Sequence, residues 1–68
     1  MKPNKDGYWL IKRRVSIMGG EISVKEIVLL EMEHNLVHPF GCQPKRIGTF
    51  EREYNVIEWI KYIDIEKL

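Results

Sequence analysis

The segment Ile17-Met18-Gly19-Gly20-Glu21-Ile22 decides the fold, because a pair of glycines here joins two runs of alternating apolar residues. Gly-Gly in this setting is typical of a β-hairpin whose type I′ turn has positive φ at both central residues. With Gly19 and Gly20 as the turn, residues 8–18 and 21–33 become the two strands. The residues that then face each other are Ile17 and Ile22, Val15 and Val24, Arg13 and Glu26, Ile11 and Val28, and Trp9 and Leu30.

The first face of this hairpin is apolar apart from Arg13 and Glu26, which the register predicts to be a directly opposed ion pair. The second face is polar near the turn and apolar at the open end. A two-stranded ribbon is not stable alone, so the first face needs a full cover and the second a partial one. A competing interpretation remains: Ser23-Val24-Lys25-Glu26 has capping-box spacing, which would start a helix over residues 24–35.

The rest of the chain is predicted from its breakers and its apolar spacing. Residues 35–46 are expected to form a loop, because Pro39, Gly41 and Pro44 interrupt any regular element. Residues 45–50 are predicted to form a short third strand, in which Gly48 indicates a bulge. Residues 53–63 are predicted to form a helix, because apolar residues recur there at helical spacing. Their β-branched content leaves a strand over 55–65 as the alternative.

We therefore expect an α+β fold: a long antiparallel β-hairpin and a short third strand packed against one C-terminal α-helix. The alternative is a small all-β barrel. The 68 residues suffice for one small domain, with residues 1–7 as a flexible lead-in. A single cysteine excludes an internal disulfide, and no apolar run is long enough to cross a bilayer. These features favour a cytoplasmic protein.

A weak metal-site candidate consists of His34, His38 and Cys42, which are four residues apart, with Glu31 or Glu33 as a fourth ligand. This spacing matches no zinc signature, and the intervening proline and glycine prevent a helix from aligning the side chains. Two loop histidines and a half-buried thiol explain the same residues. We predict no metal and no cofactor. The chain also has no catalytic triad, phosphate loop or paired-carboxylate motif, so we predict that it is not an enzyme.

Candidate partner-binding residues come from the second hairpin face and from tyrosines that fall outside the predicted core. Exposed aromatic residues beside arginine are typical anchors of protein interfaces. The same residues could instead border the seam between helix and sheet. The candidate set is Tyr8, Leu10, Lys12, Arg14, Lys25, Ile27, Leu29, Tyr54 and Tyr62.

A candidate nucleic-acid set begins with Lys12, Arg14 and Lys25, which share one hairpin face. A basic β-ribbon can enter the DNA major groove, although basic residues also protect a solvated sheet. The set extends to Lys45 and Arg46. A net charge of +1 gives no global electrostatic footprint for nucleic acid.

The run Lys45-Arg46-Ile47-Gly48-Thr49-Phe50, followed by an amphipathic segment, resembles the end of AP2-type domains and of the arm-binding domains of phage integrases. The resemblance covers about a third of the chain. It implies a three-stranded antiparallel sheet on one C-terminal helix, with DNA bound through the sheet.

Our leading functional hypothesis is a small non-enzymatic protein-binding module. Its biological form could be a phage or mobile-element accessory protein that inhibits a host factor or defence system. The alternatives are a sheet-mediated DNA-binding domain of the AP2 or integrase-arm type, and a structural homo-oligomer such as a homodimer.

Overall fold

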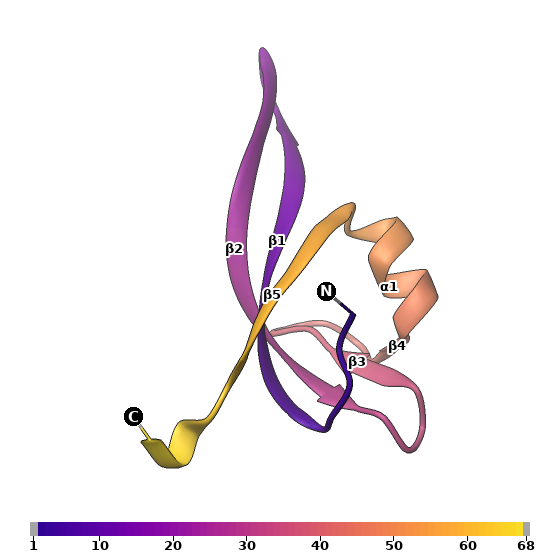
Figure 1. Cartoon of the computed structure of the whole chain (residues 1–68). Coiled ribbons are helices and arrows are strands. Elements are labelled where there is room, and N and C mark those ends of the chain that lie inside the picture. Colours follow the sequence, from indigo (N-terminus) through magenta and orange to yellow (C-terminus); the bar gives the residue numbers. More distant parts are fainter. Residues whose placement is uncertain (1, 68) are drawn as a thin grey trace.

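The computed structural model describes residues 2–67, which form a mostly-β α+β domain built on one antiparallel sheet (Figure 1). The strand order is β4-β3-β2-β1-β5, so the first strand of the chain lies beside the last one. The sheet is open, and the helix precedes the last strand. The elements are β1 (Gly7–Ile17), β2 (Gly20–Glu31), β3 (Leu36–His38), β4 (Lys45–Arg46), α1 (Ile47–Glu53), β5 (Val56–Ile63) and the 3-10 helix η1 (Ile65–Lys67).

The predicted hairpin is confirmed, but its turn lies one residue earlier than expected. Met18 and Gly19 form the turn, and Gly20 already belongs to β2 opposite Ile17. The φ angle is positive at Gly19 (91°) but not at Gly20, which fits a type II turn rather than type I′. Arg13 is therefore opposite Val24 instead of Glu26. The facing residues move by two positions, so each side chain keeps its predicted face.

The helix and the strand predicted after residue 44 are exchanged. The strand predicted over residues 45–50 is present only as β4, and α1 begins at Ile47. Residues 56–63 form β5 instead of the helix predicted over 53–63. The loop predicted over 35–46 is also interrupted by β3, which pairs with β2. Two register irregularities between β1 and β5 explain the error. As a result, β5 places an apolar residue on the core side of the sheet at every third position instead of every second one. These residues are Val56, Trp59 and Tyr62. That spacing imitates the helical period. The alternative of a strand at 55–65 is confirmed for residues 56–63. The barrel that accompanied it is wrong, as is the helix at 24–35.

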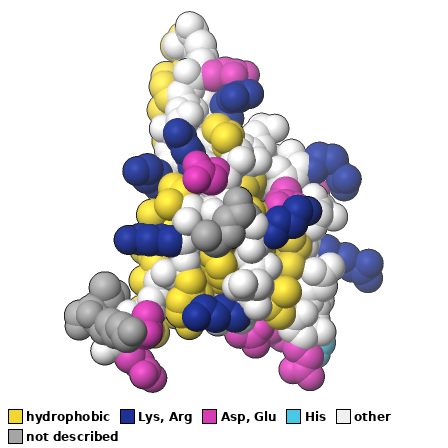
Figure 2. Space-filling model, viewed as in Figure 1, with side chains coloured by type: hydrophobic (Ala, Val, Ile, Leu, Met, Phe, Trp, Pro, Cys, Tyr) yellow, Lys and Arg dark blue, Asp and Glu magenta, His cyan; other side chains and the backbone are white. Residues whose placement is uncertain are grey.

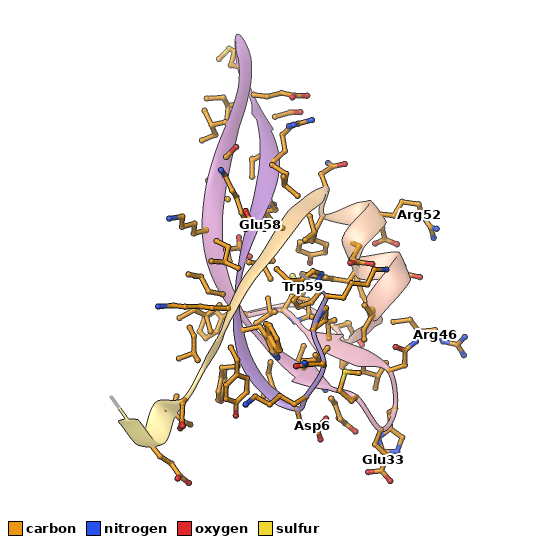
Figure 3. The ribbon with its side chains drawn as sticks, viewed as in Figure 1. Asp6, Glu33, Arg46, Arg52, Glu58 and Trp59 are labelled. Carbon is orange, nitrogen blue, oxygen red and sulfur yellow. The ribbon has the colours of Figure 1, made fainter. Side chains whose placement is uncertain are left out.

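The hydrophobic core lies between one face of the sheet and α1. Trp9 and Trp59 meet edge to face with ring centroids 6.2 Å apart, and Phe50 of α1 is fully buried beside them. Figure 3 shows Trp59 pointing from β5 toward the side where α1 lies. The buried core consists of Trp9, Ile11, Val28, Leu30, Val37, Phe50 and Trp59.

The segment before β1 contacts the same side of the sheet. The indole Nε1 of Trp9 donates to the carbonyl of Lys5 at 3.0 Å, and the ammonium of Lys5 lies 4.0 Å from the ring centre of Tyr62. The carboxylate of Asp6 accepts a hydrogen bond from the backbone N–H of Met32 at 2.7 Å. None of the helices formed by residues 2–67 has the length and apolarity needed to cross a bilayer.

The far end of the hairpin projects from this body as a two-stranded arm, residues 14–23 (Figure 1). It projects because β5 accompanies β1 as far as Arg13, whereas β3 accompanies β2 from Leu29 to Glu31. The arm exposes aliphatic side chains: Met18 is 100% exposed, and Ile17 and Ile22 are about half exposed.

Candidate interaction face

The sheet face opposite α1, which we call the open face, carries most of the predicted partner-binding residues. Residues directly opposite each other in an antiparallel sheet point to the same face. The register therefore arranges this face in rows that change from apolar to charged toward the arm. The rows are His38, Leu29, Tyr8 and Ile63; then Ile27, Leu10 and Lys61; then Lys25, Lys12 and Glu58.

Phe40 adds an aromatic side chain to the open face. It lies in the loop between β3 and β4 and is 98% exposed. One shallow hollow lies between Phe40 and the row of Leu10 and Ile27, and a second lies between Phe40 and the row of Tyr8 and Leu29. Phe40 and Ile27 line both hollows, and Lys25 and Glu26 add charged side chains to the first one.

The basic residues of the open face have unequal neighbours. Lys12 and Lys25 are directly opposite each other, which sets two like charges side by side. Lys12 has Glu58 as its neighbour on β5. Arg14, in the next row, forms an exposed ion pair with Glu21 at 3.5 Å. The three predicted basic residues of the hairpin are therefore brought together.

Lys45 and Arg46 are not brought to this cluster. They form β4 at the far edge of the sheet, with β3 and β2 between them and β1. Lys45 makes an ion pair with Glu53 at 2.9 Å, and Figure 3 shows Arg46 pointing outward at this edge. In Figure 2 basic and acidic side chains alternate over the visible surface instead of forming a patch of one sign. The predicted nucleic-acid set is therefore divided between two separate places.

Tyr54 and Tyr62 lie away from the open face, and their predicted position outside the core is wrong. Tyr54 stacks on Phe50 with ring centroids 4.7 Å apart, and Tyr62 packs edge to face on Trp9 at 5.8 Å. The pKa of the Tyr54 hydroxyl is raised above its usual range, mainly by a hydrogen bond with the thiol of Cys42 and secondarily by burial. Both tyrosines belong to the core side of the sheet.

The weak metal candidates also separate. The two histidines share one carboxylate, because His34 Nδ1 and His38 Nε2 both contact Glu31, the latter at 3.1 Å. These contacts, led by the one from His34, lower the pKa of Glu31. Cys42 interacts with Tyr54 instead, and Figure 3 shows Glu33 pointing outward. Within residues 2–67, no three such side chains are arranged to hold a metal ion.

Phe40 is the member of the face that the sequence-derived set lacks. Its position depends on the loop between β3 and β4, whose path is set by the pairing of those strands rather than by local periodicity. The signal available in the sequence was its place between Pro39 and Gly41. An aromatic residue held between two breakers cannot belong to a long regular element, so its ring is free to lie at a surface.

Comparison with known proteins found no match to this chain among protein-family models, curated proteins or solved structures. The layout implied by the resemblance to AP2-type domains is also not observed. Residues 2–67 form five strands instead of three, and α1 precedes the last of them instead of following it. The functional argument therefore depends on the open face itself.

Proposed function

We propose that this protein is a small non-enzymatic protein-binding module that binds its partner through the open face. The observation that supports this most is Phe40, which is 98% exposed and lines two hollows together with Ile27 on a sheet face that α1 leaves uncovered. Exposed apolar patches of this kind typically mark interaction sites. An accessory protein of a phage or mobile element that inhibits a host factor or defence system is the role we favour.

The arrangement suggests the chemistry of the partner. Phe40 and Ile27, which is 51% exposed, would supply the apolar centre of the interface. Burying a phenylalanine side chain contributes about 1.5–3 kcal/mol relative to leaving it in water. Lys12 and Lys25 border this centre on the arm side. A complementary partner would place an apolar side chain over Ile27 and a carboxylate beside the two lysines.

The test compares two variants that remove exposed hydrophobic side chains from different places. Phe40→Ala alters the open face, whereas Ile57→Ala alters an exposed residue of β5 that lines neither hollow. Immobilised wild type and variants are incubated with lysate of the native host, and retained proteins are identified by mass spectrometry. We expect a protein that wild type and Ile57→Ala retain and Phe40→Ala loses. Identical retention by all three would refute binding through this face.

DNA binding is the second candidate, and the cluster of Lys12, Lys25 and Arg14 on one face favours it. Binding of a labelled duplex can be followed by fluorescence anisotropy over a salt series. A DNA-binding face made of these residues would give an affinity that falls steeply with salt, and Lys12→Ala would reduce that slope. Absence of binding at low salt would exclude this function.

A further inference from the structure

The outer edge of β2, in the arm and at the adjoining Val24 and Lys25, has backbone groups that point away from β1. Ile17 and Gly20 flank the two-residue turn as a hydrogen-bonded pair, and such pairs alternate with non-bonded ones along an antiparallel ladder. The N–H and C=O groups of Glu21, Ser23 and Lys25 therefore face outward. A backbone contact supports this phase: the N–H of Arg14, which is opposite Ser23, donates away from β2 to the carbonyl of Asn55 at 3.0 Å.

This edge is open over the length of the arm. β3 covers β2 at Leu29–Glu31, beyond the arm. Among residues 2–67, no backbone hydrogen bond outside the strand ladders engages Glu21, Ser23 or Lys25. All three side chains are exposed. Unpaired strand edges are ready templates for a further strand, and natural proteins usually protect them.

We propose that two copies of this chain pair through the arm edge of β2, antiparallel, about a twofold axis at Ser23. Glu21 of each copy is then opposite Lys25 of the other, so the twofold produces two ion pairs from one match. Ile22 is opposite Val24 on the neighbouring face of the ribbon. This register also allows the backbone hydrogen bonds between the two copies, because the backbone groups of Glu21, Ser23 and Lys25 face outward and meet each other across the axis.

Charge selects this register over its neighbours. An axis at Ile22 would set Glu21 opposite Ser23, and an axis at Val24 would set Glu21 opposite Ile27, so either shift removes both ion pairs. The pairing would also offset a repulsion within each chain, because Lys25 is directly opposite Lys12. Within one chain the Glu21 carboxylate makes an exposed ion pair with Arg14 at 3.5 Å, which leaves it accessible to Lys25 of a second copy.

The length of the open edge agrees with the length of the arm. In this register the turn residues Gly19 and Met18 of the second copy are level with Ile27 and Val28, and β3 begins to cover β2 at Leu29. The second arm therefore fits the uncovered part of β2. This inference concerns the sheet edge and does not depend on the binding function proposed for the open face.

The test measures molar mass by light scattering over a protein concentration series. We expect the wild type to approach twice the 8.1 kDa of one chain. Lys25→Glu should give the single-chain mass, because Glu21 would then meet a carboxylate across the axis. The same substitution sets an opposite charge beside Lys12, so the hairpin itself is not weakened. The double variant Glu21→Lys/Lys25→Glu reverses both partners and should restore the dimer.

A proline pair tests the backbone contacts separately. Ser23→Pro removes an outward N–H that is not needed for the ladder with β1, so it should abolish the dimer while thermal unfolding stays cooperative. Ser16→Pro, at the equivalent outward position on the β1 edge of the arm, is the matched control and should leave the dimer intact. A wild type of 8.1 kDa at every concentration overturns the proposal. So does a dimer that survives Lys25→Glu and Ser23→Pro, or a charge-reversed double variant that stays monomeric.

Discussion

Arg13 and Glu26 form an ion pair that spans the hairpin diagonally. Arg13 Nε donates to Glu26 Oε1 at 2.8 Å, although Arg13 is directly opposite Val24. A long side chain can reach the diagonal neighbour on the same face. The guanidinium also lies 5.4 Å from the ring centre of Tyr54, and the two charged side chains are 23% and 32% exposed. The pair is therefore partly shielded from water on the core side of the sheet.

We expect Arg13→Met and Glu26→Leu to be coupled. Each single change leaves a partly buried charge without its partner, so the double variant should be more stable than the two single effects predict, by about 1 kcal/mol. Urea denaturation of the four proteins of the double-mutant cycle measures this coupling. Additive effects on the free energy of unfolding would contradict a direct interaction.

Glu31 provides a prediction about pH. Its contacts with His34, and secondarily with His38, hold its pKa below the usual range for glutamate. A carboxyl group whose pKa is lowered by folding stabilises the folded state above its unfolded pKa, and that contribution is lost as pH falls through the folded pKa. NMR titration of the Glu31 side chain should show the low pKa. His34→Ala should raise it more than His38→Ala does, and equal, unshifted titrations in all three proteins would be inconsistent with this contact.

At the scale of elements, the turn of the arm predicts different effects of substitution at two adjacent glycines. Gly19 has φ of 91°, which side chains rarely adopt, whereas φ at Gly20 is not positive. Gly19→Val should therefore lower the free energy of unfolding by about 1–3 kcal/mol, and Gly20→Val should have a much smaller effect. Thermal melts of the two variants provide the comparison. A larger loss at Gly20 would place the turn at Gly19-Gly20 after all.

The sequence predicts the faces of the hairpin better than its turn, for a physical reason. Alternation of apolar residues determines which side of a strand is buried, so Trp9 and Val28 were correctly assigned to the core. A Gly-Gly pair permits more than one turn position, because either glycine can adopt the positive φ that a turn requires, and the structure uses it at Gly19 alone. The open-face residues Tyr8, Leu10 and Lys12 follow from the same alternation, whereas Phe40 depends on a loop path.

Elements after residue 44 are harder to predict, because the apolar spacing in the sequence of β5 follows its irregular pairing with β1 and not the two-residue alternation of a regular strand. The register irregularities opposite β1 give β5 an apolar spacing of three, as at Val56 and Trp59. This resembles a helix in sequence. The seven-residue α1 has few residues with which to display a period, and Phe50 is its one fully buried side chain among the described residues. No local pattern distinguishes such a helix from a short strand.

For the whole molecule, two phenylalanines should separate stability from binding. Phe50 is fully buried, and truncating such a residue to alanine typically costs about 3–5 kcal/mol. A domain of 68 residues has a total stability of about 3–10 kcal/mol, so Phe50→Ala should remove a large part of it and lower the urea midpoint markedly. Phe40→Ala removes an exposed ring and should leave the urea midpoint nearly unchanged. Similar losses in both variants would mean that Phe40 belongs to the core.

The position of β1 between β2 and β5 has a consequence for synthesis of the chain on the ribosome. Trp9 is synthesised well before its edge-to-face partner Trp59, and both belong to strands that pair directly. A nascent chain that ends before Val56 therefore has one flank of β1 without its neighbouring strand. We expect such a chain to remain incompletely folded until β5 has been synthesised. Its exposed apolar hairpin is a surface that chaperones can bind in the meantime. Folding by this route would be delayed and cooperative rather than progressive, because the pairing of β1 with β5 joins residues that are far apart in sequence.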